Sequence, residues 1–391
     1  MGLDSSGVRR IIMKEYVKNI LRKGRDVVLP IKGKVEYSIC KNKSLRDKFD
    51  ESKITDLWDK VQVNCVVDEK LPAPEIDLSI IIPLYNSERF IDKCLQSFLN
   101  QNTKYKYELV LIDDGSTDRT NEIVKSYSEN YPNIVKLVTQ PNGGISVARN
   151  TGLLNSKGKY ISFADHDDWV SEQYVEVLME NAFQENADIV KCEFSTVKND
   201  VVIQTEKRSR RVIKGDMKDN LFDYSSYIWG GIYRRDLLEK VRFPEKFWYE
   251  DMITRMLLYR QSKTFVDVGK NLYFKLSHAT NASKVVWNNK EYKCIEQLYL
   301  PEALIMNSQK IGLKIDVYAY ECLLLEYSAM LYKRTKRLPE EIKKQVFLYA
   351  RNTLMKLYRS EFEATMSPKW KKWHMIFSEK KYDAWKALGA V

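Results

Sequence analysis

The first half of the chain alternates short runs of apolar residues with segments in which apolar residues recur at helical spacing. Four apolar runs, each bounded by polar residues, occupy 78–82, 108–113, 134–138 and 160–165. Runs of this kind are typical of strands that are buried on both faces, because no alternation marks a side exposed to solvent. The pattern therefore predicts four buried strands.

Each predicted strand is followed by a predicted helix. In 87–100, apolar residues fall at helical intervals and Ser87 is a candidate N-cap residue. The other three helices are predicted at 117–130, from about 145 to 155, and from 171 to about 185. Strands that alternate with helices indicate βαβ units, so the predicted fold is an α/β fold with a mostly parallel sheet flanked by helices.

Polar or glycine-rich sequence follows every predicted strand. In such a sheet, ligands bind in the crevice beyond the carboxyl ends of the strands. The segments expected at that edge are PLYN (83–86), DDGSTD (113–118), QPNGGISVARN (140–150) and DHDD (165–168). Their convergence on one edge predicts a binding site there.

The remaining sequence suggests three regions. Residues 1–76 form a charged accessory region with a helix-like start at 11–25, and the prolines of LPAPEID suggest a linker at its end. The α/β domain is expected at 77–285, with a further strand at 188–194 and a helix beginning at Asp251. A helical, basic C-terminal region is expected at 286–391, including an apolar helix at 318–332.

Composition narrows the class of protein. With 44% hydrophobic and 30% charged residues, the chain has the composition of a globular protein. No apolar run approaches 18 residues and the N-terminus lacks the pattern of a signal peptide, so neither a transmembrane helix nor secretion is expected. The six cysteines are scattered without a C-x-x-C pair, which argues against a zinc ribbon or a disulfide framework and suggests a cytoplasmic setting.

The net charge of +11 is concentrated at the C-terminus, where the segment from Lys333 onward has 15 Lys or Arg against 6 Asp or Glu. Such a tail suggests an acidic partner. In 367–377, Trp370 and Trp373 alternate with lysines, as in segments that contact the inner face of a membrane. The alternative is that these aromatic residues are buried in an interdomain or oligomer contact. The apolar helix at 318–332 could also support a homo-oligomer.

The acidic run DHDD is the main candidate for phosphate chemistry. The chain has neither G-x-x-x-x-G-K-[ST] nor G-x-G-x-x-G after the first strand, which disfavours kinase-type and dinucleotide-binding sites. Mg²⁺ and Mn²⁺ prefer oxygen ligands and connect carboxylates to substrate phosphates. The alternative is an ordinary solvated turn in which Asp168 caps the next helix.

Six blocks of sequence resemble the family 2 glycosyltransferases, which have the GT-A fold. They are SIIIPLYN, VLIDDGSTDRT, NGGISVARNTGL, GKYISFADHDDW, WGGIYRRDLL and EKFWYEDMITRMLL. The resemblance covers about 78–280 and leaves out both ends of the chain. It implies an inverting enzyme of bacterial cell-surface glycan synthesis.

The resemblance also implies roles for individual residues. Asp251 would be the catalytic base, Asp167 a metal ligand and His278 an additional one. Trp229 and Trp248 could line the acceptor side together with Glu250, because the flat apolar faces of sugars stack on aromatic rings. Core packing is the alternative for the two tryptophans. The residues expected to bind the nucleotide sugar are Pro83, Tyr85, Asp113, Asp114, Asn142, Gly143, Arg149, Asn150, Asp165 and Asp167. The pair Arg234–Arg235 could approach the diphosphate or be exposed.

The leading functional hypothesis is a hexosyl- or N-acetylhexosaminyltransferase that uses a UDP-sugar with Mn²⁺ or Mg²⁺. Its acceptor would be a hydroxyl of a glycan, glycolipid or glycoprotein, and no nucleic acid partner is expected. A sugar-1-phosphate nucleotidyltransferase is a second hypothesis, although PLYNSE lacks that class's glycine-rich basic loop. A third is a non-enzymatic protein that binds polyanions through its basic tail.

Overall fold

The computed structural model describes residues 44–55, 63–217, 220–279, 281 and 292–390. The helix predicted at 11–25 lies outside these residues. The chain divides into two compact units. We call them the α/β unit, which comprises Val61–Val285 and Ala303–Ile315, and the helical unit, which comprises Met1–Lys60, Val286–Glu302 and Asp316–Val391. The domain 77–285 proposed from the sequence lies within the α/β unit.

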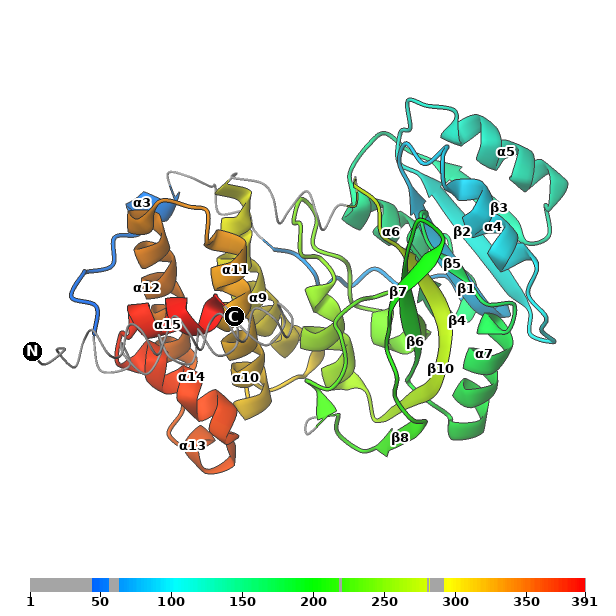
Figure 1. Ribbon diagram of the computed structural model, residues 1–391. Coiled ribbons are helices and arrows are strands. Elements are labelled where there is room, and N and C mark those ends of the chain that lie inside the picture. The colour runs from blue at the N-terminus through cyan, green and yellow to red at the C-terminus, as the bar shows by residue number, and fades with distance from the viewer. Residues whose placement is uncertain (1–43, 56–62, 218–219, 280, 282–291, 391) are drawn as a thin grey trace, which may run out of the picture. The chain divides into compact units, whose positions relative to one another are not determined.

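The four predicted strands form one side of the sheet in the α/β unit (Figure 1). They are paired in parallel in the order β3-β2-β1-β4, as the sequence predicted. Their bounds are β1 Ile76–Leu84, β2 Tyr107–Asp113, β3 Val135–Thr139 and β4 Gly158–Phe163. The inner strands are almost entirely buried, which explains their continuous apolar sequence.

The four helices predicted to follow these strands are present. They are α4 Ile91–Leu99, α5 Thr120–Asn130, α6 Ile145–Leu154 and α7 Tyr174–Glu185. The prediction that Ser87 is an N-cap was wrong, because α4 begins at Ile91 with Phe90 in the N-cap position. The Ser87 hydroxyl instead accepts a hydrogen bond from the backbone N–H of Tyr85 at 3.2 Å. Ser87 therefore shapes the loop after β1.

The other side of the sheet mixes parallel and antiparallel pairs. It continues from β4 in the order β9-β6-β10-β5, with β7 paired to β6 and β8 paired to β10. Strand β10 is parallel to β6, whereas β9 is antiparallel to both β4 and β6. The bounds are β5 Trp169–Val170, β6 Ile189–Lys198, β7 Val201–Thr205, β8 Arg211–Lys214, β9 Gly231–Arg234 and β10 Thr264–Leu276. The parallel arrangement thus describes the first four strands, and the whole sheet is mixed.

The helix predicted from Asp251 is short and wide. Thr254–Tyr259 forms a π-helix whose residues are all buried. A 3₁₀ turn at Arg235–Leu238 follows β9. These elements continue the chain between β9 and β10.

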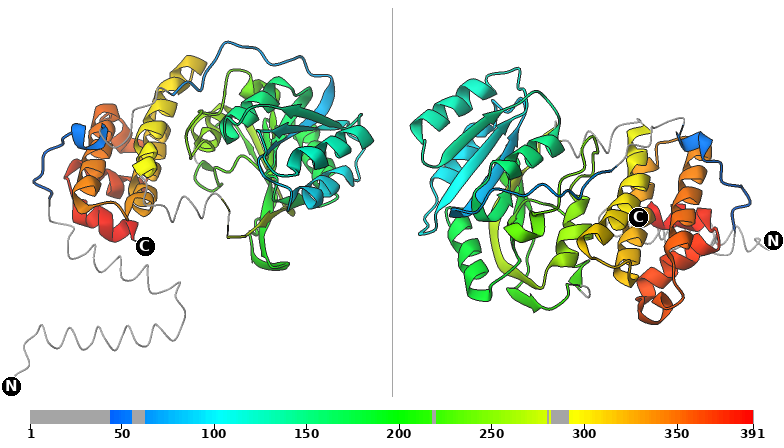
Figure 2. Two further views of the ribbon diagram at one scale, coloured as in Figure 1. Left: turned by 90° about the horizontal axis from the view of Figure 1, so that it is seen from above. Right: turned by 180° about the vertical axis from the view of Figure 1, so that it is seen from behind.

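The helical unit contains most of the C-terminal region and the short helix α3 Ser52–Thr55 (Figure 2). Helix α9 Glu296–Ser308 contributes residues to both units. The 3₁₀ turns are Tyr292–Ile295 before α9 and Gln309–Ile311 after it. The helices that follow are α10 Val317–Leu325, α11 Leu331–Thr335, α12 Glu340–Leu357, α13 Phe362–Thr365, α14 Pro368–Ser378 and α15 Tyr382–Gly389.

The apolar helix predicted at 318–332 is interrupted. It consists of α10, a π-helical turn at Glu326–Met330 and the start of α11. Most of the side chains of α10 are buried within the chain. Its apolar character is therefore explained by the core of the helical unit, and the homo-oligomer stays a prediction. No helix among the described residues is both long and apolar enough to cross a membrane.

The aromatic residues of 367–377 are directed into the helical unit. Trp370, Trp373, Ile376 and Phe377 are all buried, and the ring of Phe377 stacks on that of Phe347 in α12 with centroids 5.1 Å apart. Burial within the helical unit accounts for these residues, which is neither the membrane contact nor the interdomain or oligomer contact considered from the sequence. This segment has lysines but no exposed tryptophan to offer to a lipid surface.

Helix α6 packs so closely on β1 that one position must be glycine. A Cβ atom built on Gly152 would lie 2.3 Å from Cγ2 of Ile81 in the middle of β1. The contact fixes the depth at which α6 lies on the sheet, and so the position of the residues at its N-terminal end.

We expect Gly152→Ala to destabilise the protein by about 1–3 kcal/mol, because the added methyl group overpacks the contact with Ile81. Urea unfolding measures the change. Thr151→Ala places the same residue one position earlier in α6, where the side chain is partly exposed, and should be neutral or slightly stabilising. Equal stability of the two variants would contradict the packing argument.

Candidate functional site

The carboxyl ends of β1, β2 and β4 bring the predicted loops to one edge of the sheet. Leu84 at the end of β1 is in register with Asp113 at the end of β2, and β4 pairs with β1 on its other side. Tyr85, directly after β1, is 47% exposed. Pro83 is buried within β1. Tyr85 is therefore the residue of this pair that can offer a ring to a ligand.

Asp113 and Asp114 shape the neighbouring loops. Asp113 accepts hydrogen bonds from the Ser116 N–H at 3.1 Å and from the Asn121 side chain at 2.7 Å. The carboxylate of Asp114 accepts from the backbone N–H groups of Gly143 and Gly144 at 2.9 and 2.8 Å. Both aspartates are buried.

The glycine loop is also attached to Asp114 by Asn142. The Asn142 side chain donates to the backbone oxygen of Asp114 at 3.0 Å. Gly144 has a φ of 86°, which a residue with a Cβ atom adopts only with strain, and helix α6 begins directly after it. Asp114 thus holds the loop that leads into α6.

Three carboxylates converge after β4. Oxygen atoms of Asp165, Asp167 and Asp168 all lie within 4.8 Å of one another. We call these residues the acidic cluster. The acidic cluster brings three like charges close together. Because a bound cation would offset their repulsion and carboxylate oxygens are good ligands, this geometry can bind a cation.

Asp168 attaches the acidic cluster to strand β10. It accepts hydrogen bonds from the Tyr273 hydroxyl and the Leu276 N–H of β10, both at 2.8 Å. Burial, reinforced by the charges of Asp167 and Asp165, raises the pKa of Asp168 well above its ordinary value. Helix α7 begins only at Tyr174. Asp168 therefore binds β10 rather than capping α7.

Asp167 and His278 meet although 111 residues separate them. Nε2 of His278 lies 2.7 Å from Oδ2 of Asp167, and the side chain of Asn281 donates to the same oxygen at 3.0 Å. The ring of Phe90 stacks on His278 with centroids 4.7 Å apart. His278 thus lies at the acidic cluster, as the sequence suggested, whereas Asn281 had no recognisable sequence signal.

Arg149 connects the acidic cluster to the segment before the π-helix. Its guanidinium donates to Glu250 at 2.7 Å and to Asp165 at 3.1 Å, and the residue is only 3% exposed. Burial raises the pKa of Glu250 to about 7, with Arg149 opposing this shift and Asp251 adding to it. Asp251, the predicted base, is the half-buried neighbour of Glu250.

Asn150 has a positioning task. Its amide nitrogen donates to the backbone oxygen of Phe243 at 3.0 Å, and its amide oxygen accepts from the Phe243 N–H at 2.8 Å. Both the nitrogen and the oxygen of the Asn150 amide therefore form hydrogen bonds with the segment that leads to Glu250. This differs from the expectation that Asn150 would face the nucleotide.

The two predicted acceptor-side tryptophans differ. Trp248 is half-buried. Trp229 is 6% exposed and lies between two rings, with centroids 4.5 Å from Tyr227 and 4.7 Å from Tyr273. Core packing, the alternative reading, thus describes Trp229, and Tyr227 is the exposed end of this stack.

Arg234 and Arg235 lie at the other end of β4. Arg234 pairs with Tyr160 near the start of β4, because β9 runs antiparallel to it. Arg235 is buried and donates to the backbone oxygens of Gly158 and Ser156, both at 2.9 Å. Of the two readings of this pair, an approach to the diphosphate does not fit the start of β4, and exposure does not fit Arg235, which is 6% exposed.

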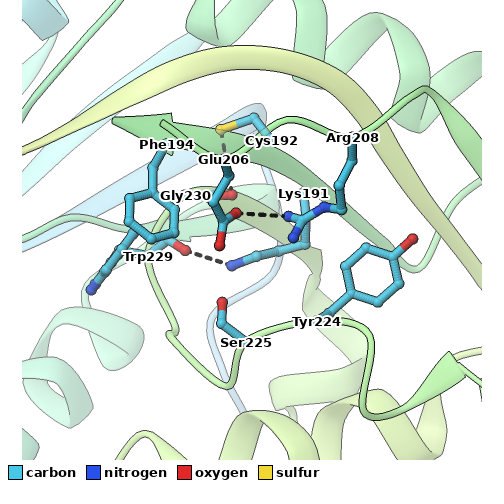
Figure 3. A pocket seen from close by; sticks show the side chains of 9 residues that line it. All are labelled: Lys191, Cys192, Phe194, Glu206, Arg208, Tyr224, Ser225, Trp229 and Gly230. Carbon is cyan, nitrogen blue, oxygen red and sulfur yellow. Dashed lines mark hydrogen bonds and ion pairs between the residues drawn. The ribbon is translucent and has the colours of Figure 1, made fainter. Parts of the chain in front are cut away.

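A small cavity beside Trp229 contains charged residues that sequence reasoning missed (Figure 3). Its volume is about 10 Å³, which is near the minimum for one water molecule. Burial lowers the pKa of Lys191 to about 8, and its ammonium group donates to the backbone oxygens of Tyr227 and Trp229. Lys191 thus holds the Tyr227–Trp229 segment in place.

Comparison with known proteins identifies the family. Residues 79–266 match the family model described as glycosyl transferase family 2. The chain is 30% identical over 258 residues to the uncharacterized glycosyltransferase EpsJ of Bacillus subtilis (strain 168), covering 63% of this chain and 74% of EpsJ. The chain therefore belongs to glycosyl transferase family 2, and it is a glycosyltransferase.

Two further similarities bear on the fold and the biological context. Over 234 residues, the chain is 36% identical to the minor teichoic acid biosynthesis protein GgaA of the same organism, covering 54% of this chain and half of GgaA. The crystal structure of S. aureus TarS 1–349 in complex with UDP matches with a TM-score of 0.55 and 21% identity, covering 80% of this chain and 89% of that one. This likeness confirms the predicted GT-A fold.

We expect the stability of the wild-type protein, relative to Glu250→Gln, to fall as the pH rises from about 4.5 to 7. The pKa of Glu250 is raised from 4.5 to about 7, so over this interval the folded protein holds the proton that the unfolded chain releases. Glutamine imitates the neutral acid and avoids this loss.

Urea unfolding at a series of pH values measures the effect. Glu245→Gln, at an exposed position in the same segment, should differ from the wild type by a constant amount. A constant difference for Glu250→Gln as well would contradict the burial of a titrating carboxyl group.

Proposed function

We propose that this glycosyltransferase is metal-dependent and inverting, and that it moves a sugar from a UDP-sugar to an acceptor hydroxyl by single displacement. The observation that supports this most is the contact of Arg149 with both Asp165 and Glu250. It joins a cation-binding geometry to the carboxylates needed for proton removal. The first of the three functional hypotheses is thus favoured over the nucleotidyltransferase and the polyanion-binding protein.

The donor is bound at the edge formed by the loops after β1, β2 and β3. UDP is the nucleotide named for the TarS structure, and we take it as the donor nucleotide here. In this proposal the exposed ring of Tyr85 packs on the base, beside the Pro83 end of β1. Asp113 and Asp114, with Asn142 and Gly143, form the wall that receives the nucleoside.

The acidic cluster fits a divalent cation. Asp167 and Asp165 are partly exposed, whereas both oxygens of Asp168 are engaged by β10. The pair Asp167–His278, with Asp165 beside it, is therefore the proposed ligand set for Mn²⁺ or Mg²⁺. When bound, such an ion neutralises a diphosphate and stabilises its departure.

Asp251 is the proposed base. An inverting transfer requires a carboxylate that takes the proton from the acceptor hydroxyl while the sugar is attacked from the face opposite the leaving group. Asp251 follows Glu250, which Arg149 holds at a fixed distance from Asp165.

The acceptor is proposed to be a bacterial cell-surface glycan or its lipid- or protein-linked precursor. The name of GgaA places that relative in teichoic acid biosynthesis. Trp248 and Tyr227 are the aromatic rings that can face such an acceptor, with Trp229 supporting Tyr227 from below. We propose that catalysis resides in 77–285 and takes place in the cytoplasm, at the inner face of the membrane.

Asp167→Ala should reduce metal-dependent hydrolysis of the UDP-sugar by at least about 100-fold, because it removes a ligand of the proposed ion. The measurement is UDP release with Mn²⁺ or Mg²⁺ over a panel of UDP-sugars. Asp92→Asn changes an exposed carboxylate on α4 and should retain the wild-type rate. Metal-independent hydrolysis in the wild type, or full activity of Asp167→Ala, would refute the metal assignment.

Asp251→Asn should reduce sugar transfer by about 10²- to 10⁴-fold, the usual contribution of a general base. Binding of UDP and of the metal should remain near the wild-type level, because Asp251 is outside the proposed ligand set. Titration calorimetry with UDP and Mn²⁺ separates the two effects. Transfer that persists in Asp251→Asn would assign the base to another residue.

A further inference from the structure

The hairpin of β6 and β7 presents aliphatic side chains to solvent. Val201, Val202 and Ile203 are 62%, 51% and 56% exposed, and all five residues of β7 are exposed. The hairpin lies in front of the sheet in Figure 1, and in the left view of Figure 2 it extends, in green, beyond the rest of the α/β unit. We call these three residues the apolar tip. Three consecutive exposed aliphatic residues form a patch rather than scattered surface positions.

The backbone makes the hairpin tight. Asn199 and Asp200, the two residues between the strands, have φ values of 49° and 59°. Two such residues form the turn whose twist matches that of paired strands. In the pairing with β6, Lys198 lies opposite Val201 and Val197 lies opposite Val202. The apolar tip is therefore held by regular strand pairing.

The apolar tip extends over both faces of the hairpin. Consecutive side chains of a strand point to opposite faces, so Val201 and Val202 are exposed on different sides. A protein partner that covers one face would leave the other in water. An apolar medium that surrounds the tip, such as the outer part of a lipid bilayer, would cover both.

The free edge of β7 is poorly suited to a second copy of the chain. Within the described residues, β7 pairs only with β6. The register shifts between Thr196 and Val197, which leaves Ile203 without a residue opposite it. Irregularities of this kind and nearby lysines protect a strand edge against pairing with another strand.

Two lysines lie at the turn of the hairpin, beside the apolar tip. Lys198 is exposed at the turn, and the Lys93 ammonium group lies 3.9 Å from Asp200 while remaining 55% exposed. The Lys93 group also lies over the ring of Trp169, 3.4 Å from its centroid. These charges complement anionic lipid headgroups.

The hairpin is continuous with the candidate active site. The backbone oxygen of Val197 accepts a hydrogen bond from the N–H of Ser277 at 2.7 Å, and His278 is the next residue. Trp169, beneath Lys93, directly follows Asp168. A surface contacted by the tip would thus lie near the acidic cluster.

We infer that the apolar tip of the β6–β7 hairpin inserts into an anionic lipid surface. It would hold the acidic cluster near that surface, where a lipid-linked acceptor would be found. This use of the contact rests on the proposed function, but the contact itself does not. It replaces the tail segment 367–377, whose tryptophans are buried, as the candidate membrane contact.

The test is co-sedimentation of the full-length chain with phosphatidylcholine vesicles that contain phosphatidylglycerol. The triple variant Val201→Thr, Val202→Thr, Ile203→Thr retains β-branched side chains and strand propensity but adds hydroxyl groups. We expect its partition coefficient to fall at least about tenfold, since burying one aliphatic side chain is worth that factor or more. The matched control, Val201→Ile with Val202→Ile, should bind as well as the wild type or better.

Two further variants make the outcome decisive. Neutralising Lys369, Lys371 and Lys372 to glutamine should leave vesicle binding largely unchanged. Hydrolysis of UDP-sugars without lipid should be equal in the wild type and in the threonine, isoleucine and tail variants. Asp167→Ala should still bind vesicles, so failure of the proposed chemistry would be seen separately. Absence of wild-type binding, equal binding of the threonine variant, or loss of binding only in the tail variant would overturn the inference. A dimer in gel filtration that the threonine variant dissociates would assign the tip to a second copy instead.

Discussion

The candidate site depends on one buried charge, the guanidinium of Arg149. An unpaired cation at 3% exposure would be strongly unfavourable, so the fold must bring carboxylates to it. Asp165 from the end of β4 and Glu250 from the segment before the π-helix meet that requirement, each at one terminal nitrogen of the guanidinium. Helix α6, held at its depth on β1 by the Gly152 contact, sets where this charge lies. Removing one partner would leave the other charges buried and unbalanced.

A second, neutral set of contacts fixes the other side of the acidic cluster. Asp168 accepts from the Tyr273 hydroxyl and the Leu276 backbone, and Tyr273 stacks on Trp229. The ammonium group of Lys191 in turn donates a hydrogen bond to the backbone oxygen of Trp229. The acidic cluster is thus attached both to the parallel half of the sheet and to the mixed half. Strand β10 holds Asp168 through Tyr273 and Leu276, and its carboxyl end leads directly to His278.

The sequence predicted best where local pattern decides structure. The four buried strands and the loops after them followed from apolar runs and the edge rule, because both depend on neighbouring residues. It predicted less well where partners are distant in sequence. No residue near Asn150 in the sequence indicates that its side-chain amide forms hydrogen bonds with the backbone of Phe243. Similarly, no residue near Arg235 indicates that β9 runs antiparallel to β4, which places Arg235 at the start of β4. Likewise, alternating tryptophans and lysines in 367–377 gave a membrane-like pattern that burial in the helical unit explains.

The bonds of Asp114 have a consequence for ligand recognition. Its carboxylate binds the N–H groups of Gly143 and Gly144, and Asn142 binds its backbone oxygen, so the protein itself determines the shape of this loop. A loop that is already ordered does not lose conformational entropy when a ligand arrives, and more of the contact energy then appears as affinity. Rigidity has an opposite effect on scope, because a wall that cannot adapt discriminates between ligands of different width. The loop that contains Asn142, Gly143 and Gly144 is therefore a point at which a ligand bound at this edge of the sheet would be selected by its shape, because the loop does not close around it.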